Sequence, residues 1–455
     1  MTRLTRRSSA AFAVLIALSL FLGLALMRTP RPDGDAIRYI YYAINLHDYG
    51  VFSAQHGRRV APPAPENVHA PLYPAWVALF MRLDPGFGAS LACVVDDRNA
   101  RSDCPLNFTL FVAAQLVLAG VFFGATWLLA FRLSDDPLIA WLTAGFALLS
   151  QDPLSYANHV LTEALLLPLL ALFSVFLVIA YQRKQMRWML AAGASLGLAT
   201  LARPAYEYLF LAMAIALAAG ALFRERRLFL AACVLFAVAY GAVVAPWMVR
   251  NKIYFDRFAL TSAYDGDILA QRVAYNRMGW VEFGVAFLYW FPDFGDNISK
   301  AVFPRRYYEK LRWESGSYFA NTAPELYRKV ETEAGSPDEV MPRLLRTEIL
   351  AHPVKHALVS LPLAWRGVFI RKYWGIAGLI CFIIVATRQK RKRDHALFVA
   401  ALPVWFMVAF HALVSVSIPR YNLALIPLYA YAMAWTAHAV GLRVIARWRT
   451  RAAGP

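Results

Sequence analysis

Acidic residues lie close together near the start of the chain, in the run Pro32-Asp33-Gly34-Asp35. An amphipathic, tyrosine-rich segment that includes Arg38 and Tyr39 follows directly. A carboxylate in such a place can act as a general base, because it can take the proton of an attacking hydroxyl group. The structural alternative is that Asp35 caps the first turn of a helix. We predict Asp35 as catalytic and Asp33, Arg38 and Tyr39 as substrate-binding, with the capping alternative left open.

A proline-rich turn follows in the same polar segment, in Asn67-Val68-His69-Ala70-Pro71-Leu72-Tyr73-Pro74. Its prolines interrupt and restart the chain, which predicts the start of a re-entrant or interfacial helix. His69 could contact a substrate there, although a surface histidine before a proline turn is commonly just solvated. We predict His69 and Tyr73 as substrate-binding residues.

A further carboxylate, Glu163, lies one helical turn inside an apolar segment. A charge inside a membrane segment costs free energy and usually serves a function. Pairing with His159, four residues earlier on the same helix face, is the structural alternative. We predict Glu163 as a second catalytic residue and leave this pairing open.

Three arginines, Arg203, Arg250 and Arg420, fall at ends of apolar segments, on the side that carries few other cations. A guanidinium group stays charged and can give a phosphate two parallel hydrogen bonds. The alternative is that each side chain extends into the lipid headgroups and binds no substrate. We predict all three arginines, together with Tyr421, as substrate-binding residues.

Membrane helices are the elements that must position these residues. Hydrophobic residues make up 59% of the 455-residue chain and charged residues 17%, against about 45–50% and about 25% in soluble domains. A stretch of about 20 apolar residues crosses a bilayer. We therefore predict an all-α polytopic membrane protein with about ten transmembrane helices and two long outer-face loops. The predicted spans are 10–27, 108–131, 137–150, 160–181, 188–202, 204–223, 228–249, 373–387, 396–417 and 421–440.

Lysine and arginine gather in the connections of one side, which the positive-inside rule assigns to the cytoplasm. Both termini are expected there, and the long loops and the active site are expected on the periplasmic face of a bacterial inner membrane. The same rule keeps the basic run 388–393 inside, so residues 354–370 are expected as an interfacial helix. The first apolar segment is expected as a retained anchor, with a cleaved signal peptide as the alternative.

The expected organisation follows from these spans and loops. It comprises an N-terminal tail and first span (1–27), a first outer loop with the candidate base (28–106), helices two to seven (107–249), a second outer loop with the interfacial helix (250–372), helices eight to ten (373–440) and a basic cytoplasmic tail (441–455).

Cys93 and Cys104 both fall in the first outer loop. A disulfide between them would fit an oxidising compartment, whereas a metal site lacks further ligands at suitable spacing. We predict the disulfide. No metal-binding residue and no cofactor is predicted, and a divalent metal is left open. The net charge of +18 is spread over short runs between apolar segments, so nucleic acid is not expected as a partner.

The order of these motifs resembles the multi-span GT-C glycosyltransferases, in particular bacterial relatives of the protein O-mannosyltransferases and the lipid A aminoarabinose transferases. Two departures stand out: Ala36 replaces a glutamate beside the aspartate, and Ala70 replaces a lysine that some relatives carry. The matching elements are Asp35-Ala36-Ile37-Arg38-Tyr39, Pro71-Leu72-Tyr73-Pro74, Glu163, Gly197 to Pro204, Pro246 to Asn251, and Arg420-Tyr421 through Pro427.

The resemblance implies an inverting glycosyltransferase that uses a polyprenyl-phosphate sugar, because no nucleotide sugar is expected outside the cytoplasm. Asp35 would be the base, and the arginines would stabilise the departing phosphate. The expected partners are this donor, an envelope glycan, lipid or protein as acceptor, and the lipid bilayer. The alternatives are a transporter or flippase of lipid-linked sugars, whose polar groups should lie near the bilayer midplane, and an oligosaccharide polymerase or ligase.

Overall fold

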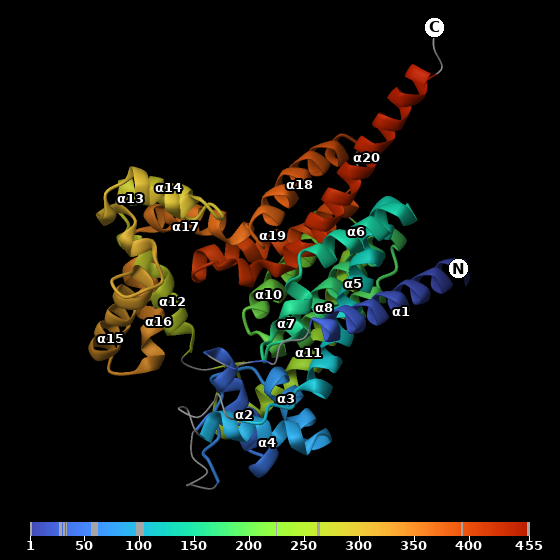
Figure 1. Cartoon of the computed structure of the whole chain (residues 1–455). Helices are drawn as coiled ribbons and strands as arrows, with labels where there is room; N and C mark the ends of the chain where they lie inside the picture. Colours follow the sequence, from blue (N-terminus) through green and yellow to red (C-terminus); the bar gives the residue numbers. More distant parts are fainter. Residues whose placement is uncertain are drawn as a thin grey trace. The chain divides into compact units, whose positions relative to one another are not determined.

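The computed structural model describes residues 2–26, 30, 32, 34–55, 62–96, 104–223, 225–261, 264–392 and 395–452. Over these residues every regular element is a helix, so the prediction of an all-α chain is confirmed (Figure 1). The chain divides into two compact units. The first comprises Met1–Thr261, Asp394–Ala400 and Ala434–Pro455, and the second comprises Ser262–Arg393 and Ala401–Met433.

The helices of the first unit follow the apolar segments of the sequence. They are α1 (Thr2–Ala25), α2 (Asp35–Tyr49), α3 (Leu72–Leu83), α4 (Pro85–Asp96), α5 (Thr109–Ser134), α6 (Pro137–Leu149), α7 (Asp152–Ala157), α8 (Glu163–Arg183), α9 (Trp188–Ala202), α10 (Tyr206–Phe223) and α11 (Arg226–Phe255). α1 packs on α5, α5 on α8, α8 on α9 and α9 on α11, while α2, α3 and α4 pack on one another.

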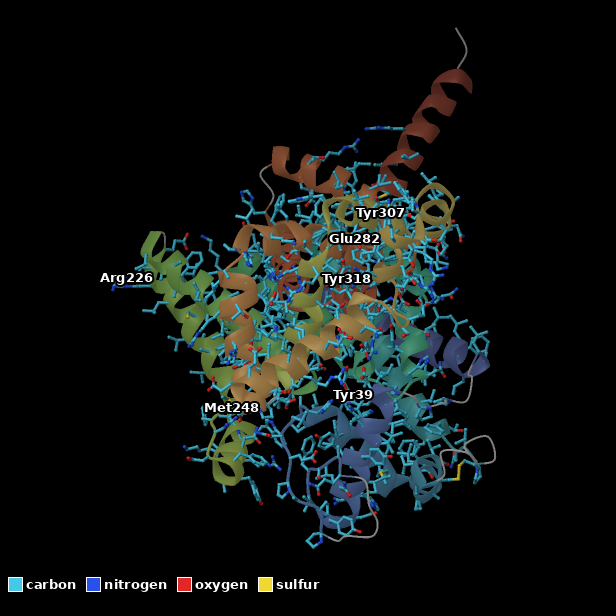
Figure 2. All side chains as sticks on the ribbon, turned by 90° about the vertical axis from the view of Figure 1, so that its left-hand side faces the viewer. Tyr39, Arg226, Met248, Glu282, Tyr307 and Tyr318 are labelled. Carbon is cyan, nitrogen blue, oxygen red and sulfur yellow. A yellow bond between two sulfur atoms is a disulfide. The ribbon has the colours of Figure 1, made fainter. Side chains whose placement is uncertain are left out.

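The second unit has shorter helices at its start and longer apolar helices at its end. They are α12 (Tyr264–Ala274), α13 (Trp280–Tyr289), α14 (Gly295–Val302), α15 (Ala323–Ala334), α16 (Val340–Leu344), α17 (Pro353–Val368), α18 (Tyr373–Lys392), most of α19 (Ala396–Val414) and the start of α20 (Ile426–Ala452). Its core includes Tyr318, whose hydroxyl donates to Glu282 Oε2 at 2.8 Å (both labelled in Figure 2).

Six helical segments of the described chain are long and apolar enough to cross a membrane. They are Ser8–Ala25, Thr109–Ser134, Glu163–Arg183, Arg226–Phe255, Ala396–Val414 and Pro419–Arg443. The chain is therefore an integral membrane protein. Of the other four predicted spans, 137–150, 188–202 and 204–223 correspond to the shorter apolar helices α6, α9 and α10, and 373–387 lies in α18.

A sharp bend separates α17 from α18. Only together are Pro353–Val368 and Tyr373–Gln389 long and apolar enough to form one membrane span. Their helix axes differ by 109°. Residues 354–370 are therefore not collinear with the apolar helix that follows. A helix lying in the interface requires such a bend, and its location in the membrane stays a prediction.

Close approach of α1 to α5 depends on glycines. A Cβ at Gly120 would lie 2.5 Å from the Cα of Ile16, and one at Gly124 would lie 2.6 Å from the Phe12 ring. Small residues allow helix backbones to approach closely where lipid provides no hydrophobic driving force. These two positions fix how α1 lies along α5.

The predicted topology can be tested at His395, which is exposed just after the basic run 388–393. A cysteine at this position, with Cys233 and Cys381 replaced by alanine, is expected to resist a membrane-impermeant thiol reagent in intact cells. It should react after permeabilisation, because the positive-inside rule places this run in the cytoplasm. Prompt labelling in intact cells would instead place residues 388–395 outside.

Candidate functional site

The candidate base lies at the start of α2. The helix begins at Asp35, and the N-cap position is occupied by Gly34, which has a φ of 49° and makes no side-chain cap. Asp35 is therefore a first-turn residue, where the helix dipole favours a negative charge. Its side chain and that of Arg38 are exposed. The other predicted aspartate, Asp33, lies outside the described residues.

One face of α2 packs on the proline-rich turn through aromatic rings. The ring centroid of Tyr39 lies 5.8 Å from that of His69 and 5.4 Å from that of Tyr73 (Tyr39 is labelled in Figure 2). Tyr42 lies 5.5 Å from His69 on the same face. The two polar segments that sequence reasoning singled out are therefore in contact.

Electrostatics connect His69 to the start of α2. Burial, and then the nearby charge of Arg38, lower the pKa of His69 to about 4, while Asp35 acts in the opposite direction. Arg38 and Asp35 are thus both close enough to act on the imidazole. His69 is neutral at physiological pH, so it can serve as a hydrogen-bonding or packing group rather than as a cation.

His69 also makes stability depend on pH. In the unfolded chain its pKa is near 6.5, the ordinary value of a histidine, whereas in the folded protein its pKa is about 4. The unfolded state therefore binds more protons in this window, and stability should fall as the pH falls from about 6.5 to about 4. We expect His69→Gln to lose less stability than the parent between pH 7 and pH 4.5, measured as the apparent Tm in detergent. An unchanged loss would contradict this role of His69.

Glu163 and Arg203 form a buried ion pair. Arg203 Nη2 donates to Glu163 Oε1 at 3.1 Å. The Arg203 side chain is 17% exposed and the Glu163 side chain 1%. Glu163 begins α8 and Arg203 follows the end of α9, so each charge has the sign that its helix end favours. His159, the partner considered from the sequence, instead places Nδ1 2.7 Å from the Ser155 carbonyl oxygen.

Tyr73 connects this ion pair to the aromatic face of α2. Its hydroxyl donates to Gln115 Oε1 at 3.2 Å, and Gln115 Nε2 donates to the Ala157 carbonyl oxygen at 2.9 Å. Glu163 and Tyr39 are both close enough to act electrostatically on Tyr73. The predicted residues of the first unit therefore form a continuous set from Asp35 to Arg203.

The stability of the ion pair can be tested by removing one charge. We expect Glu163→Gln to destabilise the protein by about 3–5 kcal/mol, because it leaves Arg203 without that buried carboxylate. The apparent Tm in detergent measures this loss. Glu225→Gln is the matched control: Glu225 accepts a bond from Lys184 at 3.1 Å, but both side chains are more than half exposed, so about 0–1 kcal/mol is expected. Equal effects of the two substitutions would contradict the assignment.

Arg250 lies near the end of α11. Its Nη1 donates to the Glu66 carbonyl oxygen and to Asn251 Oδ1, each at 2.9 Å. Its guanidinium carbon also lies 4.7 Å from the Trp247 ring centroid. Unlike Arg203, it forms no ion pair with a carboxylate of the described residues, so its positive charge is available to an anion.

Glu66 is a site residue that sequence reasoning missed. Its Oε2 accepts hydrogen bonds from the Tyr42 hydroxyl at 3.1 Å and from the Ala54 backbone N–H at 3.0 Å. Burial, and then the charge of Glu66, raise the pKa of the Tyr42 hydroxyl. Glu66 thus holds the irregular segment around Ala54 against α2 and, through its carbonyl, orients Arg250. It lies in irregular chain, where no periodic pattern marks it.

Arg420 and Tyr421 belong to the second unit. They lie in a 3-10 helical segment, Pro419–Leu425, that follows α19. The Tyr421 ring centroid lies 5.5 Å from that of His411, and Tyr421 packs on the core of its unit. The other predicted residues that the structure describes lie in the first unit.

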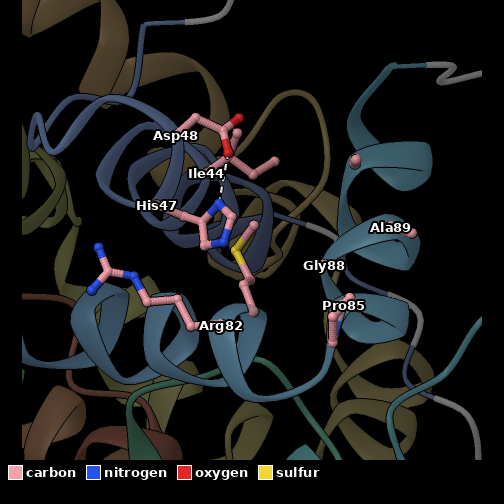
Figure 3. Close-up of a pocket in the computed structure, with 9 residues that line it drawn as sticks. Ile44, His47, Asp48, Arg82, Pro85, Gly88 and Ala89 are labelled. Atoms are coloured by element: carbon pink, nitrogen blue, oxygen red, sulfur yellow. Dashed lines mark hydrogen bonds and ion pairs between the residues drawn. The ribbon is translucent and has the colours of Figure 1, made fainter.

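A disulfide joins Cys93 and Cys104 and ties the end of α4 to the segment before α5. α4 is held further by Ser90, whose hydroxyl donates to the Pro105 carbonyl oxygen at 2.8 Å. A groove of about 470 Å³ lies between α2, α3 and α4, and none of the predicted site residues lines it. Figure 3 shows His47 and Asp48 on its α2 side and Arg82 on α3.

Metal ligands do not gather in the part of the chain that the structure describes. No group of three or more His, Cys, Asp or Glu side chains there could hold a metal ion.

Two solved structures resemble this fold over most of the chain. The archaeal oligosaccharyltransferase AglB from Archaeoglobus fulgidus, in complex with an inhibitory peptide and a dolichol-phosphate, is 13% identical, with a TM-score of 0.48, and aligns with 98% of this chain and 52% of its own. ArnT from Cupriavidus metallidurans, bound to undecaprenyl phosphate, is 14% identical, with a TM-score of 0.39, over 93% of this chain and 77% of its own.

This chain therefore spans about half the length of the archaeal protein. No family model matches the chain, and no curated protein sequence matches it.

Proposed function

We propose that the chain is an inverting glycosyltransferase that moves a sugar from a polyprenyl-phosphate donor to an acceptor on the periplasmic face of the inner membrane. One observation carries the proposal. An exposed carboxylate, Asp35, and an exposed guanidinium, that of Arg38, lie at the start of α2, and Glu66 joins Arg250 to the same helix: its carbonyl oxygen accepts from Arg250 and its carboxylate accepts from Tyr42. A base and two phosphate-binding cations are the groups that this reaction needs.

Asp35 is the base of the proposed reaction. It takes the proton of the acceptor hydroxyl as that oxygen attacks the anomeric carbon, and the bond between this carbon and the phosphate oxygen breaks. The leaving group departs as a phosphate anion, so no general acid is required. A single displacement of this kind inverts the configuration at the anomeric carbon.

Arg250 is the main phosphate contact of the proposed site, and Arg38 is a second cation for the donor. The charge of Arg250 is not matched by a carboxylate ion pair among the described residues, whereas Arg203 is paired with Glu163. We propose that Glu163 serves the reaction by holding Arg203 in place and by acting electrostatically on Tyr73. For Arg420 and Tyr421, the motif resemblance supports a role in substrate binding.

The donor class can be tested with the purified protein. A panel of polyprenyl-phosphate sugars, with a membrane extract as acceptor, is expected to give transfer and release of polyprenyl phosphate, whereas nucleotide sugars should give none. Asp48→Asn is the matched control for Asp35→Asn and should keep transfer activity. Asp48 is exposed at the opposite end of α2, and its Oδ1 lies 2.6 Å from His47 Nδ1. Transfer from a nucleotide sugar alone would overturn the proposed donor.

A flippase for lipid-linked sugars is the second candidate that the sequence raised. A flippase moves its substrate across the bilayer and leaves the bond between sugar and phosphate intact. In proteoliposomes, release of polyprenyl phosphate from the donor therefore separates the two functions. Movement of intact donor between leaflets without release would support the flippase.

A further inference from the structure

Arg366, near the end of α17, is a buried cation with no carboxylate beside it. Its side chain is 6% exposed. Its guanidinium carbon lies 4.4 Å from the ring centroid of Trp290, 4.9 Å from that of Trp313 and 5.7 Å from that of Tyr275. The rings attract the cation through their π-faces, but they supply no negative charge. Of the described acidic side chains, none pairs with it.

Hydrogen bonding leaves most of this guanidinium unused. Nη2 donates to the Val416 carbonyl oxygen, whereas Nε and Nη1 are buried and donate to no described residue. The Tyr275 hydroxyl lies near the guanidinium but outside hydrogen-bonding geometry, and it is also buried without a partner. Buried donors without acceptors lose the hydration that they have in water, so native structures rarely leave them without a reason.

A second buried arginine in the same unit shows what a purely structural role looks like. Arg272 is fully buried, and all three of its side-chain nitrogens donate to neutral acceptors at 2.6–3.0 Å. These acceptors are Ala412 O, Asn276 Oδ1, His356 O and Ser360 Oγ. The fold is thus able to satisfy a buried guanidinium with its own groups. At Arg366 it does so for one nitrogen only.

We propose that Arg366 and Tyr275 form a binding site for a phosphate group within the second unit. The two unused guanidinium nitrogens and the Tyr275 hydroxyl supply three donors, and the oxygens of one phosphate group can accept from all of them. Arginine suits this ligand because it stays charged and can bind with more than one nitrogen. Tyr421 packs on the core cluster that contains Tyr275.

Trp313 is the wall through which a ligand would enter. Trp313 is 43% exposed, and its ring covers the guanidinium on one side. It lies in an irregular segment between two short helical segments, Glu309–Leu311 and Tyr318–Thr322. Trp290, by contrast, is held in place, because its Nε1 donates to the Leu311 carbonyl oxygen at 3.3 Å.

The site is built from residues of the second unit alone, and it does not depend on the proposed function. Its test is the apparent Tm of the purified full chain in detergent, with inorganic phosphate in one arm and mixed micelles containing a polyprenyl phosphate in the other. A ligand that binds only the folded state raises the apparent Tm with its concentration. We expect a rise of several degrees for the parent in at least one arm.

Three variants give this test its specificity. Arg366→Met keeps the bulk of the side chain and removes the charge, so it should abolish the rise and be at least as stable as the parent without phosphate, since the buried charge is gone. Tyr275→Phe removes one hydroxyl, so the same rise in apparent Tm should need about tenfold more ligand. This variant tests the site even if Arg366→Met fails to fold. Lys355→Met removes an exposed cation of the same helix and should respond like the parent.

The arms also identify the source of the phosphate. A rise with inorganic phosphate indicates a free phosphate site, and a rise only with the lipid indicates a headgroup site. Either result supports the proposal when Tyr275→Phe weakens it. No rise in either arm, or equal rises in the parent and in Tyr275→Phe, would overturn the proposal.

Discussion

Asp35→Asn is expected to lower sugar transfer by about 10²- to 10⁴-fold while the protein stays folded and inserted in the membrane. The amide keeps the size of the side chain but cannot accept the acceptor's proton. Asp35 is exposed, so its replacement should cost little stability. The measurement is kcat with a defined polyprenyl-phosphate sugar, and the apparent Tm shows that folding is intact.

Two control variants locate the base. Asp48→Asn, on the same helix, should retain activity close to that of the parent. Asp33→Asn tests the neighbouring carboxylate of the same motif. Loss of transfer with Asp33→Asn alone would move the base two residues upstream, and activity of Asp35→Asn within a few-fold of the parent would remove Asp35 from the mechanism.

Arg250→Ala is expected to reduce transfer by about 10- to 150-fold, which corresponds to the roughly 1.5–3 kcal/mol of one hydrogen bond to a charged group. Arg250→Lys should also impair transfer, because a lysine cannot reproduce the planar, bidentate geometry of a guanidinium. If Arg250 binds the phosphate mainly in the transition state, kcat falls. If it captures the donor, the donor KM rises.

Lys252→Ala provides the matched control for Arg250. Lys252 lies on the same helix and pairs with Asp256 at the surface, where both side chains are more than half exposed. Its removal should therefore leave transfer and stability nearly unchanged. Unchanged kinetics for Arg250→Ala would mean that Arg250 only anchors α11 at the headgroups, and the phosphate contact would then be sought at Arg420.

The apolar segments of the sequence predict the helices well, because burial in lipid requires long runs of apolar residues with satisfied backbone hydrogen bonds. Each of the ten predicted spans overlaps a helix over most of its length. Six of them meet the length and composition of a span. The short segments are harder to assign, since α6, α9 and α10 are apolar but shorter than a bilayer is thick.

The partners of charged residues could not be predicted from the sequence. Glu163 and Arg203 are 40 positions apart, so helix spacing suggested His159 as a partner, and only the packing of α8 on α9 brings the arginine to the carboxylate. Glu66 contacts Tyr42 and Arg250 from an irregular segment. Such a segment has no periodic pattern from which these contacts could be predicted. The contacts of Arg366 with Trp290 and Trp313 likewise depend on tertiary packing.

We expect the sugar to pass directly from a lipid-linked phosphate to the acceptor, with Asp35 as the base. The purified protein is incubated with a polyprenyl-phosphate sugar labelled at the anomeric carbon. NMR then gives the anomeric configuration of the product, and the polyprenyl phosphate released is measured in the same reaction. We expect an inverted product, one polyprenyl phosphate released per sugar transferred, and loss of both in Asp35→Asn. A product with retained configuration, or equal turnover by Asp35→Asn, would exclude this mechanism.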